Sequence, residues 1–254
     1  MADATPGPGP MGGLIAHLLE LRARLLKAAL AVLLALLALL PFSEKLYSLL
    51  ARPLVERLPA GAHMIAIQVT GPFLVPIKLS VVLALFLAMP VVLYQLWAFV
   101  SPGLYRHEKQ LALPLLVAAV LLFYAGCAFA YFLILPAAFH FLTMITPPGV
   151  SMMTDIDQYL GFVLHVFLAF GLCFEVPVVV VILAAMGVVS VEKLRSLRRY
   201  AIVLAFVVAA IITPPDALSM MLLAIPMILL YEAGVLAAAL LVRRRKVARG
   251  AAPP

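Results

Sequence analysis

The sequence predicts an all-α, polytopic integral membrane protein with six transmembrane helices and both termini in the cytoplasm. Composition, long apolar runs and the placement of Lys and Arg support this prediction. Of the 254 residues, 66% are hydrophobic and only 11% are charged, whereas about 25% are charged in an ordinary soluble domain. The 18 Lys and Arg and the 11 Asp and Glu residues are too few to cover a soluble fold of this size. So much apolar surface also excludes a disordered chain.

Apolar runs bounded by charged or turn residues predict the membrane spans, because a helix needs about 20 apolar residues to cross a hydrocarbon core of about 30 Å. The run between Arg199 and Arg243 contains a turn signal at 213–216, which divides it into two short spans. The first of these, at 200–212, rises only about 20 Å, so either the bilayer thins there or neighbouring helices shield its end. The four earlier spans are expected at about 25–42, 73–100, 111–135 and 159–189.

Most Lys and Arg residues lie before span one, between spans two and three, between spans four and five, and after span six. Positively charged loops stay in the cytoplasm, so this pattern predicts that both termini lie in the cytoplasm. The long outer loop at 43–71 is expected to hold short amphipathic helices bent at Pro53. The expected organisation is a flexible lead at 1–13, a six-helix transmembrane domain at 14–242 and a basic cytoplasmic tail at 243–254.

The sequence lacks the common motifs of enzymes and cofactor sites. It has no Gly-Lys pair for a P-loop, no His-Glu-x-x-His and no Gly-x-Ser-x-Gly. Cys127 and Cys173 both lie in apolar runs, where we expect free, buried thiols rather than a disulfide or zinc module. We therefore expect no enzymatic activity, no cofactor and no metal site. The positive charges cluster between apolar runs rather than on one soluble face, which argues against binding to nucleic acid.

Two acidic residues fall inside the predicted spans. Glu175 lies in the fourth span and Glu232 in the sixth. An ionisable group at such depth is costly and usually functional. The structural alternative for Glu175 is a protonated side chain bonded to a neighbouring helix, and Pro177 frees a backbone carbonyl nearby. Nothing near Glu232 in the sequence indicates a partner.

Other polar residues near the spans have simpler interpretations. Asp155 and Asp157 begin the fourth span, where N-capping is favoured over a catalytic carboxylate pair. Lys78 lies near the outer end of the second span and is expected to extend its ammonium to the membrane surface. His165, within the fourth span, is expected to form a helix-packing hydrogen bond.

Two carboxylates, Glu20 and Glu108, lie in predicted cytoplasmic segments beside basic residues. Each alone would make a weak surface ion pair with its own neighbours. Together they form a pair of acceptors suited to the bidentate geometry of guanidinium groups. Two further alternatives stay open: a proton-coupled small-solute transporter that uses Glu175 as the proton carrier, and a membrane scaffold in which the acidic residues are only structural.

Six segments of the sequence form a recognisable set of motifs: HLLELRAR at 17–24, SPGLYRHE at 101–108, FGLCFEVP at 170–177, TPPD at 213–216, IPM at 225–227 and YE at 231–232. Together they resemble the TatC subunit of twin-arginine protein translocases. The similarity extends from Gly13 to about Arg243, with the motifs in the family's order. It implies a signal-peptide receptor and core subunit in the bacterial inner membrane that exports folded proteins, driven by the proton-motive force.

The resemblance also implies partners and a signal-peptide site. The implied partners are single-span TatA- and TatB-type subunits, twin-arginine signal peptides of folded cargo, the lipid bilayer and further copies of the chain in a larger complex. Glu20 and Glu108 correspond to the positions that recognise the paired arginines. The residues implied to form the signal-peptide site are Glu20, Arg22, Phe99, Leu104, Tyr105, His107 and Glu108.

Two further groups of positions follow from the same resemblance. Glu175 corresponds to the acidic residue that faces the family's concave membrane cavity, where a polar group of a partner helix can meet it. We group Glu232 with it as a second intramembrane polar position. The outer-face positions implied to matter for function are Pro53, Asp155, Thr213, Pro214, Pro215 and Asp216.

Overall fold

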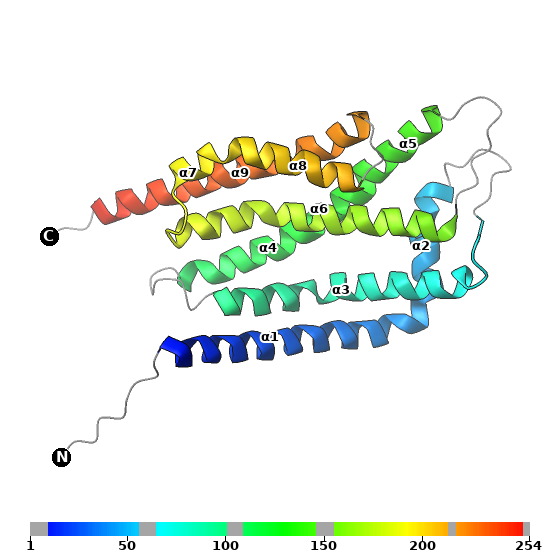
Figure 1. Ribbon diagram of the computed structural model, residues 1–254, viewed down its shortest axis with the longest axis horizontal. Helices are drawn as coiled ribbons and strands as arrows, with labels where there is room; N and C mark the ends of the chain where they lie inside the picture. The colour runs from blue at the N-terminus through cyan, green and yellow to red at the C-terminus, as the bar shows by residue number, and fades with distance from the viewer. Residues whose placement is uncertain (1–9, 56–64, 101–108, 146–154, 213–216, 251–254) are drawn as a thin grey trace, which may run out of the picture.

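The computed structural model describes residues 10–55, 65–100, 109–145, 155–212 and 217–250, and most of these residues are helical. The long helices run side by side, and the start of α1 lies at the same end of the bundle as the end of α9 (Figure 1). We call this the terminal end and the opposite end the α2 end. In chain order the elements are α1 (Pro10–Leu39), η1 (Leu40–Phe42), α2 (Ser43–Val55), α3 (Gly71–Val100), α4 (Lys109–Phe129), η4 (Ala130–Ile134), α5 (Leu135–Ile145), α6 (Ile156–Ala185), α7 (Val191–Ser196), α8 (Arg198–Ile212) and α9 (Ala217–Gly250).

The fold class is confirmed as an all-helical, multi-pass membrane protein. Within the described residues, five helical segments are long and apolar enough to cross a bilayer. The short fifth span expected at 200–212 is helix α8, whose 15 residues rise about 22 Å. It packs against α9 and α6, which is one of the two arrangements expected for so short a span. The five segments are His17–Arg52, Gly71–Phe99, Leu113–Phe141, Ile156–Ala185 and Met220–Arg243.

The outer loop contains an expected helix, α2, and α2 continues through Pro53 to Val55. A turn that the sequence did not predict precedes it at the 3-10 segment Leu40–Phe42 (Figure 1), where Pro41 has no N–H to donate to the preceding turn. Tyr159 of α6 donates its hydroxyl hydrogen to the carbonyl oxygen of Leu50 at 3.1 Å, which ties α2 to the bundle.

The third span is longer than predicted. Instead of ending near residue 135, the helix passes through a π-helical turn at Ala130–Ile134 and continues as α5 to Ile145. Pro136 lies just after this turn. A proline ring clashes with the carbonyl four residues earlier, and a π turn is one known way for a helix to absorb such a disruption. Composition alone does not indicate that the helix resumes.

Two helices extend past the expected domain boundaries. Helix α1 begins at Pro10, within the expected lead at 1–13, and α9 runs to Gly250, past the expected boundary at 242. Proline is well tolerated in the first turn of a helix. At the other end, no proline or glycine occurs between Arg243 and Gly250, so the helix has no local reason to stop where the apolar run stops.

Helix α6 is the centre of the packing and contacts α3, α4, α8 and α9. Two of these contacts depend on glycine. A Cβ added to Gly126 of α4 would lie 2.5 Å from the carbonyl oxygen of Phe170, and one added to Gly234 of α9 would lie 2.8 Å from the Cα of Pro177. Small residues allow such close backbone approach between membrane helices, where dispersion rather than water exclusion drives packing.

We expect Gly126→Ala to destabilise the protein by about 1–3 kcal/mol, because the added methyl must push α4 away from α6. Thermal unfolding of purified protein in detergent measures the effect. The matched control is Gly161→Ala in α6, where an added Cβ meets nothing within 4 Å. Since alanine favours the helix over glycine, the control should be neutral or slightly stabilising. Equal effects of the two substitutions would contradict the close-packing explanation.

Candidate functional site

The surface carboxylate Glu20 is held by its own helix. Arg24, one turn further along α1, donates from Nε to Glu20 Oε1 at 3.0 Å and also from Nη2 to the same oxygen. A Glu followed four residues later by an Arg is the favourable order for a helical ion pair. Both side chains are partly exposed. The weak surface ion pair expected between Glu20 and a basic neighbour is therefore present. Because both side chains are partly exposed, another guanidinium group can reach the Glu20 carboxylate.

Glu20 lies beside a small groove between α1 and α3 at the terminal end. His17 of α1 stacks on Phe99 of α3 with their ring centroids 4.3 Å apart. Arg24, Gln95 and Phe99 line a cavity of about 160 Å³ whose other walls are mainly apolar. The arrangement places a carboxylate, the guanidinium group bound to it and an apolar surface next to one another. Of the other residues expected here, Arg22 is exposed on α1, while Leu104, Tyr105, His107 and Glu108 lie outside the described residues.

Glu175 of α6 faces a cavity of about 280 Å³ between α3 and α6. Its Oε1 atom is buried and has no hydrogen-bond partner among the described residues. The cavity is otherwise apolar, and the chain's single tryptophan, Trp97, forms part of its wall. An intramembrane carboxyl oxygen left without a partner is costly. The structural alternative, in which a neighbouring helix satisfies this group, therefore does not account for Oε1.

Glu232 differs from Glu175 because it has a partner within the chain. Arg198 Nη2 lies 2.7 Å from Glu232 Oε2, joining the start of α8 to α9. The adjacent Tyr231 donates its hydroxyl hydrogen to the carbonyl oxygen of Leu194 at 2.7 Å, which ties α7 to α9 as well. The sequence showed no partner for Glu232 because Arg198 lies on a different helix. The structure gives this carboxylate a role in holding the short α7 and α8 helices in place.

The acidic residues at the start of α6 do not act as simple caps. Asp155 occupies the N-cap position, but its side chain makes no capping hydrogen bond. Its Oδ1 instead accepts from the backbone N–H of Ile67 at 3.2 Å, which tethers the segment preceding α3. Asp157 pairs with Lys78 at 2.7 Å. The expectation of capping by the Asp155 side chain is therefore wrong, and Lys78 reaches α6 rather than extending alone to the membrane surface.

The remaining residues that the sequence analysis singled out show few interactions in the described part of the chain. Pro53 lies in the last turn of α2, while Thr213, Pro214, Pro215 and Asp216 lie outside the described residues. His165 bonds within its own helix, with Nδ1 donating to the carbonyl oxygen of Gly161 at 2.6 Å, so it does not bridge helices as expected. Both cysteines are free. In the described part of the chain, no group of three or more His, Cys, Asp or Glu side chains is arranged to hold a metal.

Two residues that sequence reasoning did not single out contribute to these sites. Arg198 was counted only as a cytoplasmic positive charge, yet it pairs with Glu232. Gln95 lines the groove beside Arg24. In the sequence, a lone glutamine near the end of an apolar span is only a weak indication of a binding site. Both contributions depend on contacts between helices, which helical spacing within one segment does not reveal.

These features define a class: a multi-pass helical membrane protein with one acidic group at a membrane surface and another, unpartnered among the described residues, facing a groove within the bilayer. The family model described as "Sec-independent protein translocase protein (TatC)" matches residues 16–226. The chain belongs to the TatC family. It is accordingly a translocase component of protein export and not an enzyme.

Individual relatives agree along nearly the whole chain. A TatC protein of Azotobacter chroococcum is 53% identical over 240 residues, which cover 94% of each chain. The TatC protein of Escherichia coli K12 is 52% identical over 222 residues, covering 87% of this chain and 86% of that one. A crystal structure of the twin-arginine translocase receptor TatC superposes with a TM-score of 0.79 at 39% identity, covering 88% of this chain and 98% of the other.

We expect the pair between Arg198 and Glu232 to stabilise the protein by about 1 kcal/mol, between the values typical of exposed and buried pairs. A double-mutant cycle with Arg198→Ala and Glu232→Ala, followed by thermal unfolding in detergent, measures the coupling. Arg195→Ala, at an exposed position of α7, serves as the control for loss of a nearby positive charge. Strictly additive effects of the two substitutions would mean that the pair contributes nothing.

Proposed function

We propose that this TatC-family chain is the signal-peptide receptor and core subunit of a twin-arginine translocase in the bacterial inner membrane. The observation that carries the proposal is the placement of Glu20, whose carboxylate binds one guanidinium group beside an apolar groove. The matching crystal structure is described as a twin-arginine translocase receptor, which supports the same role here. A peptide with two adjacent arginines followed by apolar residues has the chemistry that such a surface accepts.

Recognition then proceeds by exchange of guanidinium groups. One arginine of the peptide replaces Arg24 at Glu20, and the other is bound by Glu108. Because an arginine already occupies Glu20, exchange preserves the charge balance and the carboxylate is never left unpaired. Arginine is preferred over lysine because its planar fork donates two parallel hydrogen bonds to one carboxylate. Phe99, Leu104, Tyr105 and His107 are assigned to the surrounding patch, with Arg22 as a flanking charge.

Glu175 is proposed to meet a polar group on a transmembrane helix of a TatA- or TatB-type partner. Support comes from its Oε1 atom, which has no partner among the described residues, and from the apolar cavity it faces. A hydrogen bond across two helices in the bilayer satisfies such a group and specifies the register of the partner. Glu232, already paired with Arg198, is proposed to support the bundle instead.

The proposed orientation places both termini, and with them Glu20 and Glu108, in the cytoplasm, where signal peptides of folded cargo are presented. The distribution of Lys and Arg supports this orientation. The α2 end, with Pro53 and Asp155, then faces outward. Further copies of the chain are proposed to assemble around the single-span partners. The transporter alternative has weaker support, because the cavity beside Glu175 is lined by apolar residues.

We expect Glu20→Ala or Glu108→Ala to weaken binding of a twin-arginine peptide about tenfold, since each loses a charge-assisted hydrogen-bonded pair. Fluorescence anisotropy with the protein in nanodiscs, at several salt concentrations, measures the affinity. An otherwise identical Lys-Lys peptide should bind more weakly to the wild type and show less difference between variants. Glu192→Ala, an exposed carboxylate on α7, is the charge control. Unchanged affinity in both variants would refute the assignment.

For Glu175, we expect Glu175→Leu to reduce co-purification of a single-span TatA- or TatB-type subunit about fivefold, in line with the strength of interhelical hydrogen bonds in membranes. Glu175→Gln keeps hydrogen-bonding capacity and should retain most of the binding. Leu172→Ala, at an exposed position on the same helix, controls for altered surface shape. If the leucine variant retained its partner as well as the wild type does, Glu175 would not be the contact.

A further inference from the structure

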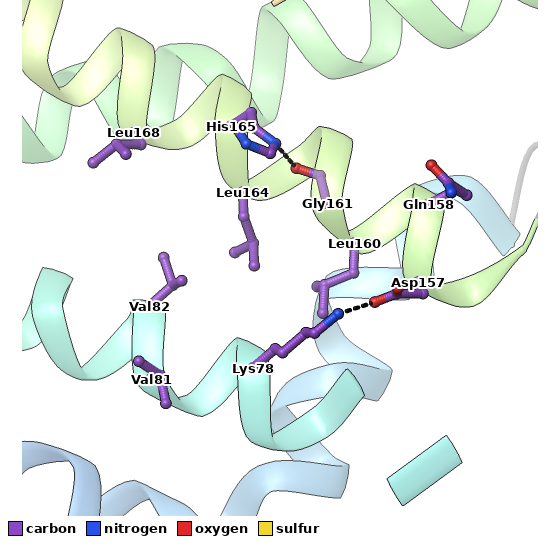
Figure 2. Close-up of a pocket in the computed structure, with 10 residues that line it drawn as sticks. All are labelled: Lys78, Val81, Val82, Asp157, Gln158, Leu160, Gly161, Leu164, His165 and Leu168. Carbon is purple, nitrogen blue, oxygen red and sulfur yellow. Dashed lines mark hydrogen bonds and ion pairs between the residues drawn. The ribbon is translucent and has the colours of Figure 1, made fainter. Parts of the chain in front are cut away.

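A second cavity opens between α3 and α6 near the α2 end, separate from the one that Glu175 faces. Its volume is about 530 Å³, within the range of about 300–1,000 Å³ typical of small-molecule sites. Figure 2 shows Lys78 reaching from α3 to Asp157 at the start of α6, with Val82, Leu164 and Leu168 further along the two helices. The cavity therefore has a charged rim and apolar walls.

The order of these groups matches the layers of a bilayer. Lys78 lies seven residues into α3, about 10 Å from Gly71 along the helix axis, and Asp157 is the second residue of α6. Leu160, Leu164 and Leu168 follow at four-residue spacing and extend about 12 Å toward the middle of the membrane. A molecule lying along this path meets charges first and apolar side chains afterwards, as a phospholipid does.

The rim presents both signs of charge. Lys78 Nζ lies 2.7 Å from Asp157 Oδ1, and the side chains are 58% and 24% exposed respectively. An ammonium has three donors and a carboxylate has several acceptor positions, so each group keeps hydrogen-bonding capacity for a ligand while the two are paired. A simple anion would gain from Lys78 and be repelled by Asp157. A zwitterion with a phosphate and a primary ammonium complements both.

The floor of the cavity has room for an acyl chain because Gly161 carries no side chain there. An added Cβ at Gly161 would meet nothing within 4 Å. His165, which also lines the cavity, turns its Nδ1 to the carbonyl oxygen of Gly161, so this backbone acceptor is already satisfied.

We propose that this cavity binds a phospholipid and selects a zwitterionic headgroup with a primary ammonium, the chemistry of phosphatidylethanolamine. The lipid phosphate accepts hydrogen bonds from Lys78, the lipid ammonium donates to Asp157, and one acyl chain lies between α3 and α6 against Val82, Leu164 and Leu168. The site is independent of the signal-peptide surface, which lies at the opposite end of the bundle.

The headgroup selection is tested by native mass spectrometry of the full chain, titrated with phosphatidylethanolamine, phosphatidylcholine or phosphatidylglycerol of identical acyl chains. Phosphatidylcholine keeps both charges but has no N–H donor. We expect the wild type to bind phosphatidylethanolamine about tenfold more tightly than the other two, the value of one charge-assisted hydrogen bond. The double variant Lys78→Met with Asp157→Asn should lose this preference, whereas Lys193→Met, exposed on α7, should keep it.

The acyl-chain part is tested with Gly161→Leu, whose Cβ meets nothing within 4 Å and whose longer side chain is expected to occupy the cavity. It should lose the tightest-bound lipid whatever the headgroup, while Ala237→Leu on an exposed position of α9 should retain it. Thermal unfolding checks that both variants fold. Equal binding of the three lipids by the wild type, or retention of the lipid by Gly161→Leu, would overturn the proposal. Displacement of the lipid by a single-span subunit at one copy per chain would assign the cavity to a helix instead and equally overturn it.

Discussion

The close packing of α6 against α4 and α9 is the contact on which the rest of the structure depends. Gly126 and Gly234 allow the backbones of α4 and α9 to contact α6 at Phe170 and Pro177. In a bilayer the surrounding lipid is as apolar as the side chains, so helices associate through dispersion and hydrogen bonds rather than by escaping water. These contacts, at Phe170 and Pro177, lie on either side of Glu175 in the sequence, so they fix the part of α6 that carries this carboxyl group.

The charged residues within the bundle follow two different patterns. Lys78 of α3 pairs with Asp157 of α6, and Arg198 of α8 pairs with Glu232 of α9. Such pairs limit the cost of keeping a charge close to the hydrocarbon region. Glu175 stands apart, because its buried Oε1 has no partner among the described residues. This difference is the basis of our proposal that Glu175 binds a group from another molecule.

Much of the fold was predictable because hydropathy and charge are local properties. The spans, the short α8 and the helix in the outer loop follow from apolar length and from the turn residues between them. The turn at Pro41 and the π-helical turn before Pro136 were missed, although both involve proline. Whether a proline bends, ends or merely perturbs a helix depends on the helices that pack against it, so the sequence alone does not distinguish Pro41, where the chain turns, from Pro53, through which α2 continues.

The sequence by itself determined the class, the membrane spans and, through its motifs, the family, because these depend on residue type and short-range order. Tertiary structure alone decided the pairing of charges. Glu20 binds a neighbour one turn away, which spacing can anticipate, but Arg198 meets Glu232 and Lys78 meets Asp157 only after separate helices come together. Ionic and hydrogen-bonding partners must lie within about 3 Å of each other, and helix packing alone sets distances of that size between residues remote in the chain.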